Sequence, residues 1–266
     1  MSTLIIIPAR YASSRYPAKP LALLTGATGI AKPLIQRSYE AASLVHGVDA
    51  LYVATDDNRI ADCVRSFGGN VIMTPAECTN GTERTAAAID VLQTQSDIII
   101  NFQGDGLLTP QYLVEQLITH MKATPDCLVA TVAVPCSPSV YRHLIEDQAA
   151  GRVGGTTTVV DARDNALYFS KRILPHIPRG HALEKKPPIM LHIGLYAYRR
   201  PALQKYLSRE EAELEHIEGL EQLRFLYHGT PIHVLKAELP MWDIIELNNP
   251  SDTGPIEAIL KARSII

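Results

Sequence analysis

Leu4-Ile5-Ile6-Ile7-Pro8-Ala9-Arg10 is the stretch from which the fold can be worked out. Four consecutive apolar residues that end at a proline are typical of a β-strand buried on both faces. Such a strand belongs in the parallel sheet of an α/β protein, in which helices flank the sheet. Arg10, the cation that follows, is then expected at the carboxyl end of this strand.

The rest of the first half repeats this pattern. Further strands are expected at residues 50–54, 70–73, 97–102 and 128–134, and helices at residues 33–45, 59–67, 82–92 and 110–122. Regular alternation of strand and helix predicts a mostly parallel, Rossmann-like sheet with right-handed crossovers. Arg10, Asp56 and Asp105 each follow directly after a strand, so we expect them at one edge of the sheet, where such folds bind ligands.

The second half is richer in β-structure. Residues 156–160 and 166–170 predict a strand pair joined by a turn at Asp164-Asn165. Further strands are expected at 192–198 and 232–235, one helix at 213–227, a final helix at 255–262, and a loop at 176–188. We therefore expect a single domain over residues 1–266, with a smaller β-rich lobe at about 155–200.

Composition excludes several classes of protein. The 266 residues are 46% hydrophobic, which suits one large α/β domain, and the net charge of −3 gives no general field for nucleic acid. No apolar run is long enough to span a bilayer, and the start lacks the features of a signal peptide. Cys63, Cys78, Cys127 and Cys136 are too scattered for metal-ligand spacing, so reduced thiols and a cytoplasmic location are expected, with no nucleic-acid or membrane partner.

The loop after the first strand concentrates groups that bind phosphate. Arg10, Arg15 and Lys19 lie within ten residues of one another, with the hydroxyls of Ser13 and Ser14 between them. Arginine offers a planar fork of donors and lysine a compact charge, and both suit phosphate. The loop lacks the glycine-rich Walker pattern. A solvated basic loop is the alternative interpretation.

A series of motifs, in this order along the chain, points to one family. They are residues 7–15 (Ile-Pro-Ala-Arg-Tyr-Ala-Ser-Ser-Arg), 17–21, 53–57 (Val-Ala-Thr-Asp-Asp), 73–74, 81–84 (Gly-Thr-Glu-Arg), 101–105 (Asn-Phe-Gln-Gly-Asp), 166–170 (Ala-Leu-Tyr-Phe-Ser), 192–199 and 214–224. Together they resemble the 3-deoxy-manno-octulosonate (Kdo) cytidylyltransferase family over nearly the whole chain. The resemblance implies a nucleotidyltransferase fold and the transfer of CMP from CTP to the anomeric hydroxyl of a sugar acid, with Mg²⁺.

The resemblance also implies roles for individual residues. It places Arg10, Ser13, Arg15 and Lys19 on the triphosphate, and Thr74, Gly81, Arg84 and Gln103 around the rest of the nucleotide. It makes Lys19 and Asp105 catalytic, Asp105 and Asp252 metal ligands, and Lys171, His192, Tyr196, Glu221 and Gln222 the sugar-acid pocket. A homodimer is implied too, with the strands near residues 166–170 and 192–199 forming a protruding arm.

Considered without the resemblance, several of these residues have simpler explanations. Asp105 ends a buried strand, where a carboxylate needs a partner or a metal, but it could instead cap the helix near Pro110. His192 lies among apolar strand residues and could be a structural histidine. Glu221 shares a helix with Glu213, Glu215 and Glu218, which is typical of a solvated acidic face.

The chain departs from the family pattern at several positions. Gly106-Leu107 stands where the family has Glu-Pro after Gln-Gly-Asp, Thr157 where it has Lys, and Lys171 where it has Arg. Pro250-Ser251 replaces Gly-Val before Asp252-Thr253, and the unusual segment before it makes Asp243 a rival metal ligand. These departures affect the acceptor and metal sides more than the nucleotide side.

Three functions therefore remain open. The first is a cytidylyltransferase that acts on a Kdo-like acid. The second is a cytidylyltransferase for another acid, such as amino-Kdo, a different 2-keto sugar acid or a phosphonate. The third is a nucleotide-binding paralogue with little activity, suggested by the missing acidic residue after Asp105.

Overall fold

The computed structural model describes residues 1–12, 16–152, 155–178 and 188–266. These residues form two compact units, one made of Met1–Lys122 and Pro240–Ile266, the other of Ala123–Leu239. No helix in the described part of the chain is long and apolar enough to cross a membrane. The expectation of a single domain with a lobe at about 155–200 stays a prediction.

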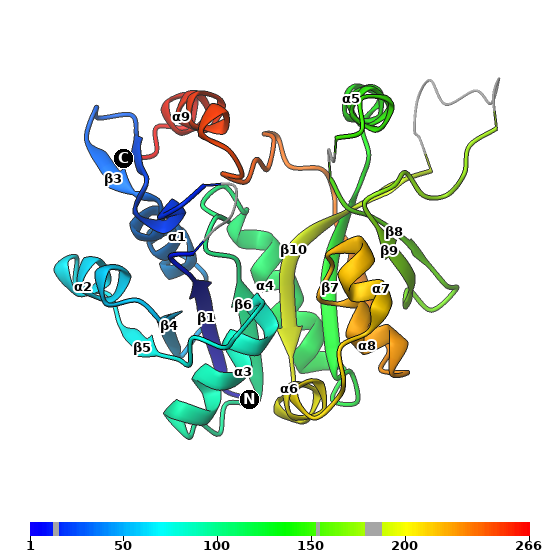
Figure 1. Cartoon of the computed structure of the whole chain (residues 1–266), viewed down its shortest axis with the longest axis horizontal. Coiled ribbons are helices and arrows are strands. Elements are labelled where there is room, and N and C mark those ends of the chain that lie inside the picture. Colours follow the sequence, from blue (N-terminus) through cyan, green and yellow to red (C-terminus); the bar gives the residue numbers. More distant parts are fainter. Residues whose placement is uncertain (13–15, 153–154, 179–187) are drawn as a thin grey trace. The chain divides into compact units, whose positions relative to one another are not determined.

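The first unit is built around strand β1 (Thr3–Ala9), which pairs in parallel with β4 (Ala50–Thr55) on one side and β6 (Ile98–Phe102) on the other. Strand β5 (Val71–Met73) extends the sheet beyond β4, again in parallel (Figure 1). Residues 4–7 are at most 1% exposed, and all of β6 is buried. The parallel sheet and its double-sided burial are as the apolar pattern predicts.

Helices α1 (Leu34–Ser43), α2 (Asn58–Ser66), α3 (Gly81–Leu92) and α4 (Gln111–Ala123) alternate with these strands. Two of them begin at side-chain caps: the Asp57 carboxylate accepts a hydrogen bond from Arg59 N, and Asn80 accepts one from Glu83 N. Such caps satisfy amides that have no partner within the helix. All four helices lie within three residues of the predicted bounds.

A hairpin between β1 and α1 was not predicted. Short helix η1 (Lys19–Leu21) leads into β2 (Leu23–Thr25) and β3 (Ala31–Pro33), which pair antiparallel. The buried Arg37 guanidinium donates to Leu24 O at 2.8 and 3.0 Å and to Ile266 O at 3.1 Å. One side chain therefore fastens both the hairpin and the end of the chain.

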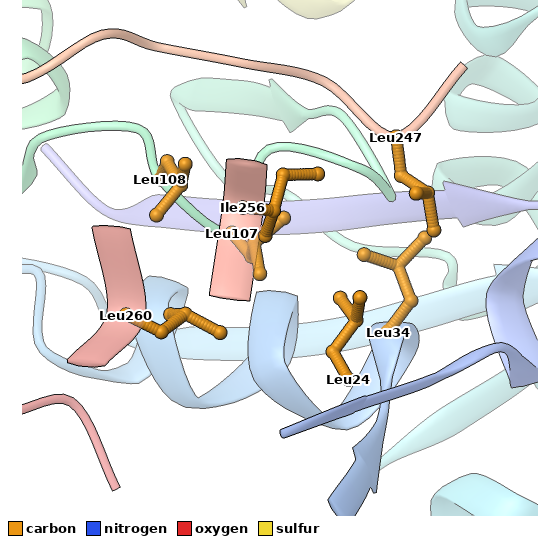
Figure 2. Close-up of a cluster of buried hydrophobic side chains, with 7 residues drawn as sticks. All are labelled: Leu24, Leu34, Leu107, Leu108, Leu247, Ile256 and Leu260. Carbon is orange, nitrogen blue, oxygen red and sulfur yellow. The ribbon is translucent and has the colours of Figure 1, made fainter. Parts of the chain in front are cut away.

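A cluster of buried side chains joins this hairpin to more distant segments. Its members are Leu24, Leu34, Leu107, Leu108, Leu247, Ile256 and Leu260 (Figure 2). Leu247 precedes the short helix η2 (Pro250–Asp252), and Ile256 and Leu260 lie on the last helix, α9 (Thr253–Ala262). Because Leu107 follows Asp105 by two residues, the cluster supports the loop that carries this carboxylate.

The second unit contains a mixed sheet. Strand β7 (Val129–Pro135) lies between the parallel strand β11 (His233–Lys236) and the antiparallel strand β10 (Met190–Tyr198). Strand β8 (Thr157–Val160) pairs with β10 and with β9 (Ala166–Ser170). The turn between β8 and β9 contains Asp164 at φ +62°, so the strand pair and its turn are confirmed.

The helices of the second unit differ from the expectation. Helices α5 (Pro138–Ala149) and α6 (Arg200–Leu207) were not predicted. The single helix predicted at 213–227 is wrong, since the structure has two, α7 (Glu213–Glu218) and α8 (Leu223–Tyr227). Gly219 adopts φ +60°, a left-handed conformation that ends α7.

Candidate active site

The four parallel strands of the first unit end at one edge of their sheet. Arg10 follows β1, Asp56 follows β4, Thr74 follows β5, and Gln103 and Asp105 follow β6. The carboxyl edge of an open parallel sheet is where α/β folds bind their ligands. The prediction that Arg10, Asp56 and Asp105 share an edge is confirmed.

Among the described site residues at this edge, Lys19 and Asp105 form an ion pair. Lys19 Nζ lies 2.5 Å from Asp105 Oδ2, and the two side chains are 21% and 13% exposed. Asp105 is six residues before the start of α4, too far to be its N-cap. The structural explanation for Asp105 therefore does not hold, and its partner is a cation.

The turn that carries Asp105 is packed tightly against β1. A Cβ on Gly104 would lie 2.7 Å from Pro8 O, so only glycine lets the two backbones approach this closely. Ser38 on α1 donates its hydroxyl hydrogen to Gly104 O at 2.8 Å. The backbone just before Asp105 is thus held by two neighbouring elements, β1 and α1.

The base of the basic loop is held at the same edge. Arg10 is exposed and donates to Thr79 O at 3.1 Å. The Arg59 guanidinium lies 3.3 Å from the centre of the Tyr11 ring and donates two bonds to the Asp57 carboxylate, at 2.9 and 2.6 Å. Ser13 and Arg15, the other predicted triphosphate ligands, lie outside the described residues.

Arg84 is a buried cation whose donors are used within the protein. It is 3% exposed and donates to Thr74 Oγ1 at 2.8 Å and to Cys78 O at 3.3 Å. Its guanidinium also lies 3.4 Å from Asp56 Oδ1, an atom that is buried and has no hydrogen bond within the described residues. Arg84 therefore fixes Thr74 in place, while Gly81 opens α3 beside it and Gln103 follows β6, half-buried.

The described residues at this edge offer too few ligands to hold a metal ion by themselves, but they suit one that is already bound to a substrate phosphate. Among the described residues there is no group of three acidic, histidine or cysteine side chains that could hold a cation. Mg²⁺ is often held by one or two carboxylates, with waters and substrate phosphates as its other ligands. Asp105 alone is therefore a sufficient protein donor for a magnesium ion that is bound to a triphosphate.

The other two candidate metal ligands, Asp252 and Asp243, differ in their contacts within the protein. Asp252 Oδ2 accepts hydrogen bonds from Asn248 N at 2.9 Å and Asn249 N at 2.7 Å, so it organises the turn before α9. Asp243 is exposed. The role of Asp252 as a second ligand, and that of its rival Asp243, stay predictions.

In the second unit, His192 is held as a neutral side chain. Burial lowers the pKa of its imidazole to about 3. Its Nε2 lies 2.9 Å from Thr131 Oγ1, and that hydroxyl lies 2.7 Å from Leu195 O. Because the carbonyl can only accept, the Thr131 hydrogen points to Leu195, so Nε2–H of His192 donates to Thr131 and Nδ1 keeps its lone pair.

Aromatic rings surround His192. The Phe169 ring meets it edge-on at 5.0 Å, and Tyr196 lies 5.3 Å away. Tyr196 is 3% exposed and stacks on Tyr198 at 5.8 Å with the ring planes 9° apart. The two predicted pocket residues of β10, His192 and Tyr196, are thus brought into contact.

The remaining predicted pocket residues lie where β9 meets α7 and α8. Glu218 accepts hydrogen bonds from Ser170 Oγ at 2.7 Å and from Lys171 N at 3.0 Å. A Cβ on Gly219 would lie 2.6 Å from Lys171 Nζ, so the ammonium lies against this glycine. Gln222 is 2% exposed and its Nε2 has no hydrogen-bond partner in the described part of the chain, whereas Glu221 is half-buried.

Two acidic residues of this region were wrongly assigned to a solvated face. Glu218 fastens the end of β9, and Glu215 forms a buried pair with Arg224, with Nη2–Oε1 at 2.6 Å and Nε–Oε2 at 2.8 Å. The sequence contained one signal for Glu218. It stands just before Gly219, at the end of a helix, where a negative charge interacts unfavourably with the helix dipole, so a specific contact elsewhere is indicated.

Comparisons with known proteins agree with this arrangement. A family model described as "Cytidylyltransferase" matches residues 4–233. The 3-deoxy-manno-octulosonate cytidylyltransferase of Maricaulis maris is 38% identical, with 98% of each chain covered. The 8-amino-3,8-dideoxy-manno-octulosonate cytidylyltransferase of Shewanella piezotolerans is also 38% identical, with 98% of this chain and 99% of the relative covered. A solved structure of a CMP:2-keto-3-deoxy-manno-octonic acid synthetase complexed with CTP has a TM-score of 0.83 and 34% identity, covering 99% of this chain and all of the other.

Proposed function

This chain belongs to the cytidylyltransferase family, and we propose that it transfers CMP from CTP to a Kdo-like sugar acid and releases pyrophosphate. The single observation that supports this most strongly is the pairing of Lys19 with Asp105 at the carboxyl edge of the parallel sheet. The two residues carry the charges that a triphosphate and its metal require, in a place where such folds bind nucleotides.

The pair explains how the site changes when the nucleotide binds. Without ligand, the ammonium and the carboxylate neutralise each other. A triphosphate offers Lys19 an anionic partner, and the metal that accompanies it offers Asp105 a cationic one. The exchange leaves neither charge unpaired, so it avoids the penalty of isolating a half-buried ion.

In the reaction, the acceptor hydroxyl oxygen forms a bond to the α-phosphorus of CTP, its proton passes to solvent, and the bond from the α-phosphorus to the leaving pyrophosphate breaks. Mg²⁺, when bound, would supply positive charge to the phosphate oxygens. Lys19 and Arg10 would neutralise and orient the triphosphate, and Gln103 would contact the cytosine or ribose. Catalysis then depends on positioning and on charge neutralisation rather than on a covalent intermediate.

The acceptor is proposed to bind the second unit through Lys171, His192, Tyr196, Glu221 and Gln222. The uncommitted Nε2 of Gln222 and the ammonium of Lys171 are donors that suit a carboxylate or hydroxyl groups. His192, whose pKa is about 3, is too weakly basic to serve as a general base near pH 7. We infer that it offers Nδ1 as a hydrogen-bond acceptor.

We also propose that the protein acts in the cytoplasm as a homodimer. Leu167, Ile217 and Tyr227 are 62%, 71% and 63% exposed and belong to the second unit, which contains the strands expected to form the arm. Molar mass measured by light scattering after size exclusion tests the dimer, and cell fractionation tests the location. A monomer at micromolar concentration would contradict the first proposal.

Pyrophosphate release tests the activity directly. Purified protein is incubated with CTP, Mg²⁺ and one of four acids: Kdo, its 8-amino analogue, another 2-keto sugar acid or a phosphonate. Both sugar-acid names occur among relatives of equal identity, so both acids belong in the panel. Pyrophosphate release with Kdo or its 8-amino analogue supports the proposal. Release only with the other acids would show that the acceptor is a different acid. CTP binding without turnover on any acid would favour the paralogue.

A further inference from the structure

The segment at residues 240–249 forms one side-chain hydrogen bond to the loop that carries Asp105, in addition to the packing of Leu247 in the buried cluster. Trp242 Nε1–H donates to Leu108 O at 2.9 Å. The guanidinium of Arg263, which directly follows the C-terminal end of α9, lies 3.3 Å from the centre of the Trp242 ring. The cation therefore stacks on the indole. Burial lowers the pKa of Arg263, and the residue remains the cation of this stack.

The loop itself consists of two linked turns. Gly106 N donates to Gln103 O at 2.9 Å, and Thr109 N donates to Gly106 O at 2.9 Å. Asp105 lies inside the first turn and Leu108 inside the second, and Gly106 belongs to both. Leu108 is thus connected to Asp105 by two hydrogen-bonded turns that share one residue.

Ordering this loop on folding costs more conformational entropy than ordering a loop that contains a proline. Gly106-Leu107 contains a glycine and no proline between Asp105 and Leu108, so the backbone there has wide freedom in the unfolded chain. Contacts from outside must supply the order. The side chains of Leu107 and Leu108, which are 4% and 1% exposed, are buried in the cluster of Figure 2. The hydrogen bond from Trp242 holds the backbone carbonyl of Leu108.

We propose that Trp242 is a positioning residue for the Asp105 carboxylate, acting through the Leu108 carbonyl. The carboxylate must hold its place when Lys19 leaves it for a phosphate, and at that moment the loop depends on its other supports. Trp242 supplies one of them through a directional bond. The inference rests on the proposed function only in that CTP and Mg²⁺ are the ligands used to test it.

Trp242→Phe tests the bond, because it keeps an aromatic ring beneath Arg263 and removes the N–H donor. Arg263→Met is the matched control, since it keeps the indole and removes the cation. CTP affinity is measured by calorimetry over a range of Mg²⁺ concentrations, without any acceptor. We expect Trp242→Phe to raise the Mg²⁺ concentration for half-maximal binding by about threefold to fivefold, the upper value being the whole energy of one hydrogen bond, and Arg263→Met to raise it less than twofold.

Hydrogen exchange gives a second readout that does not depend on any ligand. The amides of residues 103–109 should exchange faster in Trp242→Phe than in the wild type and in Arg263→Met. A variant that melts at a lower temperature but keeps the wild-type Mg²⁺ dependence and exchange would show that Trp242 is only structural, and would overturn the proposal.

If Trp242→Phe does not fold, the fluorescence of the wild-type protein provides a further test. Trp242 is the only tryptophan in the sequence, so emission excited selectively from tryptophan, and not from the tyrosines, reports on this residue alone. Emission should change when Mg²⁺ and CTP are added together, and Asp105→Asn should remove the change. Unchanged emission at saturating Mg²⁺ and CTP would contradict the coupling. None of these experiments requires catalytic turnover. If the proposed reaction were not observed, the test of Trp242 would therefore still be valid.

Discussion

Lys19 Nζ and Asp105 Oδ2 lie 2.5 Å apart, although 86 residues separate them in the sequence. The contact joins the end of the basic loop to the turn after β6. It places one cation and one anion at the carboxyl edge of the sheet, where the proposed metal–triphosphate complex would exchange with each of them. Changing either residue should therefore affect catalysis more than stability.

Asp105→Asn should reduce kcat by about 10²–10³-fold, because it removes a charge that acts on the reacting phosphates. The free energy of unfolding should fall by about 1–3 kcal/mol, because Lys19, which is 21% exposed, loses its charged partner. Pyrophosphate release and urea unfolding measure the two effects. Lys19→Met is the companion variant and should mainly raise the KM for CTP. Full activity of Asp105→Asn would show that the metal assignment is wrong.

Arg84 is expected to matter for stability as well as for the nucleotide. Arg84→Met leaves the buried Asp56 Oδ1 without its cation and Thr74 Oγ1 without its donor, which should cost about 3–5 kcal/mol of unfolding free energy. Adding Asp56→Asn removes the stranded charge, so the double variant should lose less than the sum of the single losses. Additive losses in urea unfolding would show that the two residues do not interact.

The pKa of His192 predicts a pH effect with a definite sign. The folded state keeps the imidazole neutral down to about pH 3, whereas the unfolded chain takes up a proton near pH 6.5. Protons then favour the unfolded state, so the stability contribution is present above pH 6.5 and declines by about 1.4 kcal/mol per unit as pH falls toward 3. His192→Gln, which can still donate to Thr131, should unfold with a shallower dependence between pH 4 and 6. Equal slopes would refute a neutral His192 imidazole in the folded state.

Much of the first unit was predictable, because its strands are continuous apolar runs and its loops end them with polar residues. Leu4 to Ile7 indicate a buried strand, and the residue after each such strand must lie at the carboxyl edge. The hairpin at residues 23–33 was missed because its strands have three residues each and Leu23 is exposed. Such short elements are stabilised by Arg37 and the chain end, which no local pattern reveals.

The second unit shows what local periodicity cannot resolve. Ser137-Pro138 and Pro201 are ordinary start signals for α5 and α6, and they were present in the sequence. Leucines spaced through residues 214–226 favour one helix, whereas the structure uses Gly219 to turn the chain. The contacts of Glu218 and Lys171 depend on that turn, so the arrangement of the predicted acceptor residues could not be derived from helical spacing.

Gly219 also provides the most selective test of the acceptor site. Gly219→Ala and Gly229→Ala both place a Cβ at positive φ, +60° and +72°, so each should cost about 1–2 kcal/mol of stability. At Gly219 the new methyl group would meet Lys171 Nζ at 2.6 Å and displace it, while at Gly229 it would meet no described atom within 4 Å. The KM for the sugar acid should therefore rise severalfold in Gly219→Ala alone, with the KM for CTP unchanged in both. If steady-state kinetics gave the two variants the same acceptor KM, Lys171 would not contact the acid, and the pocket assigned to the second unit would have to be redrawn without it.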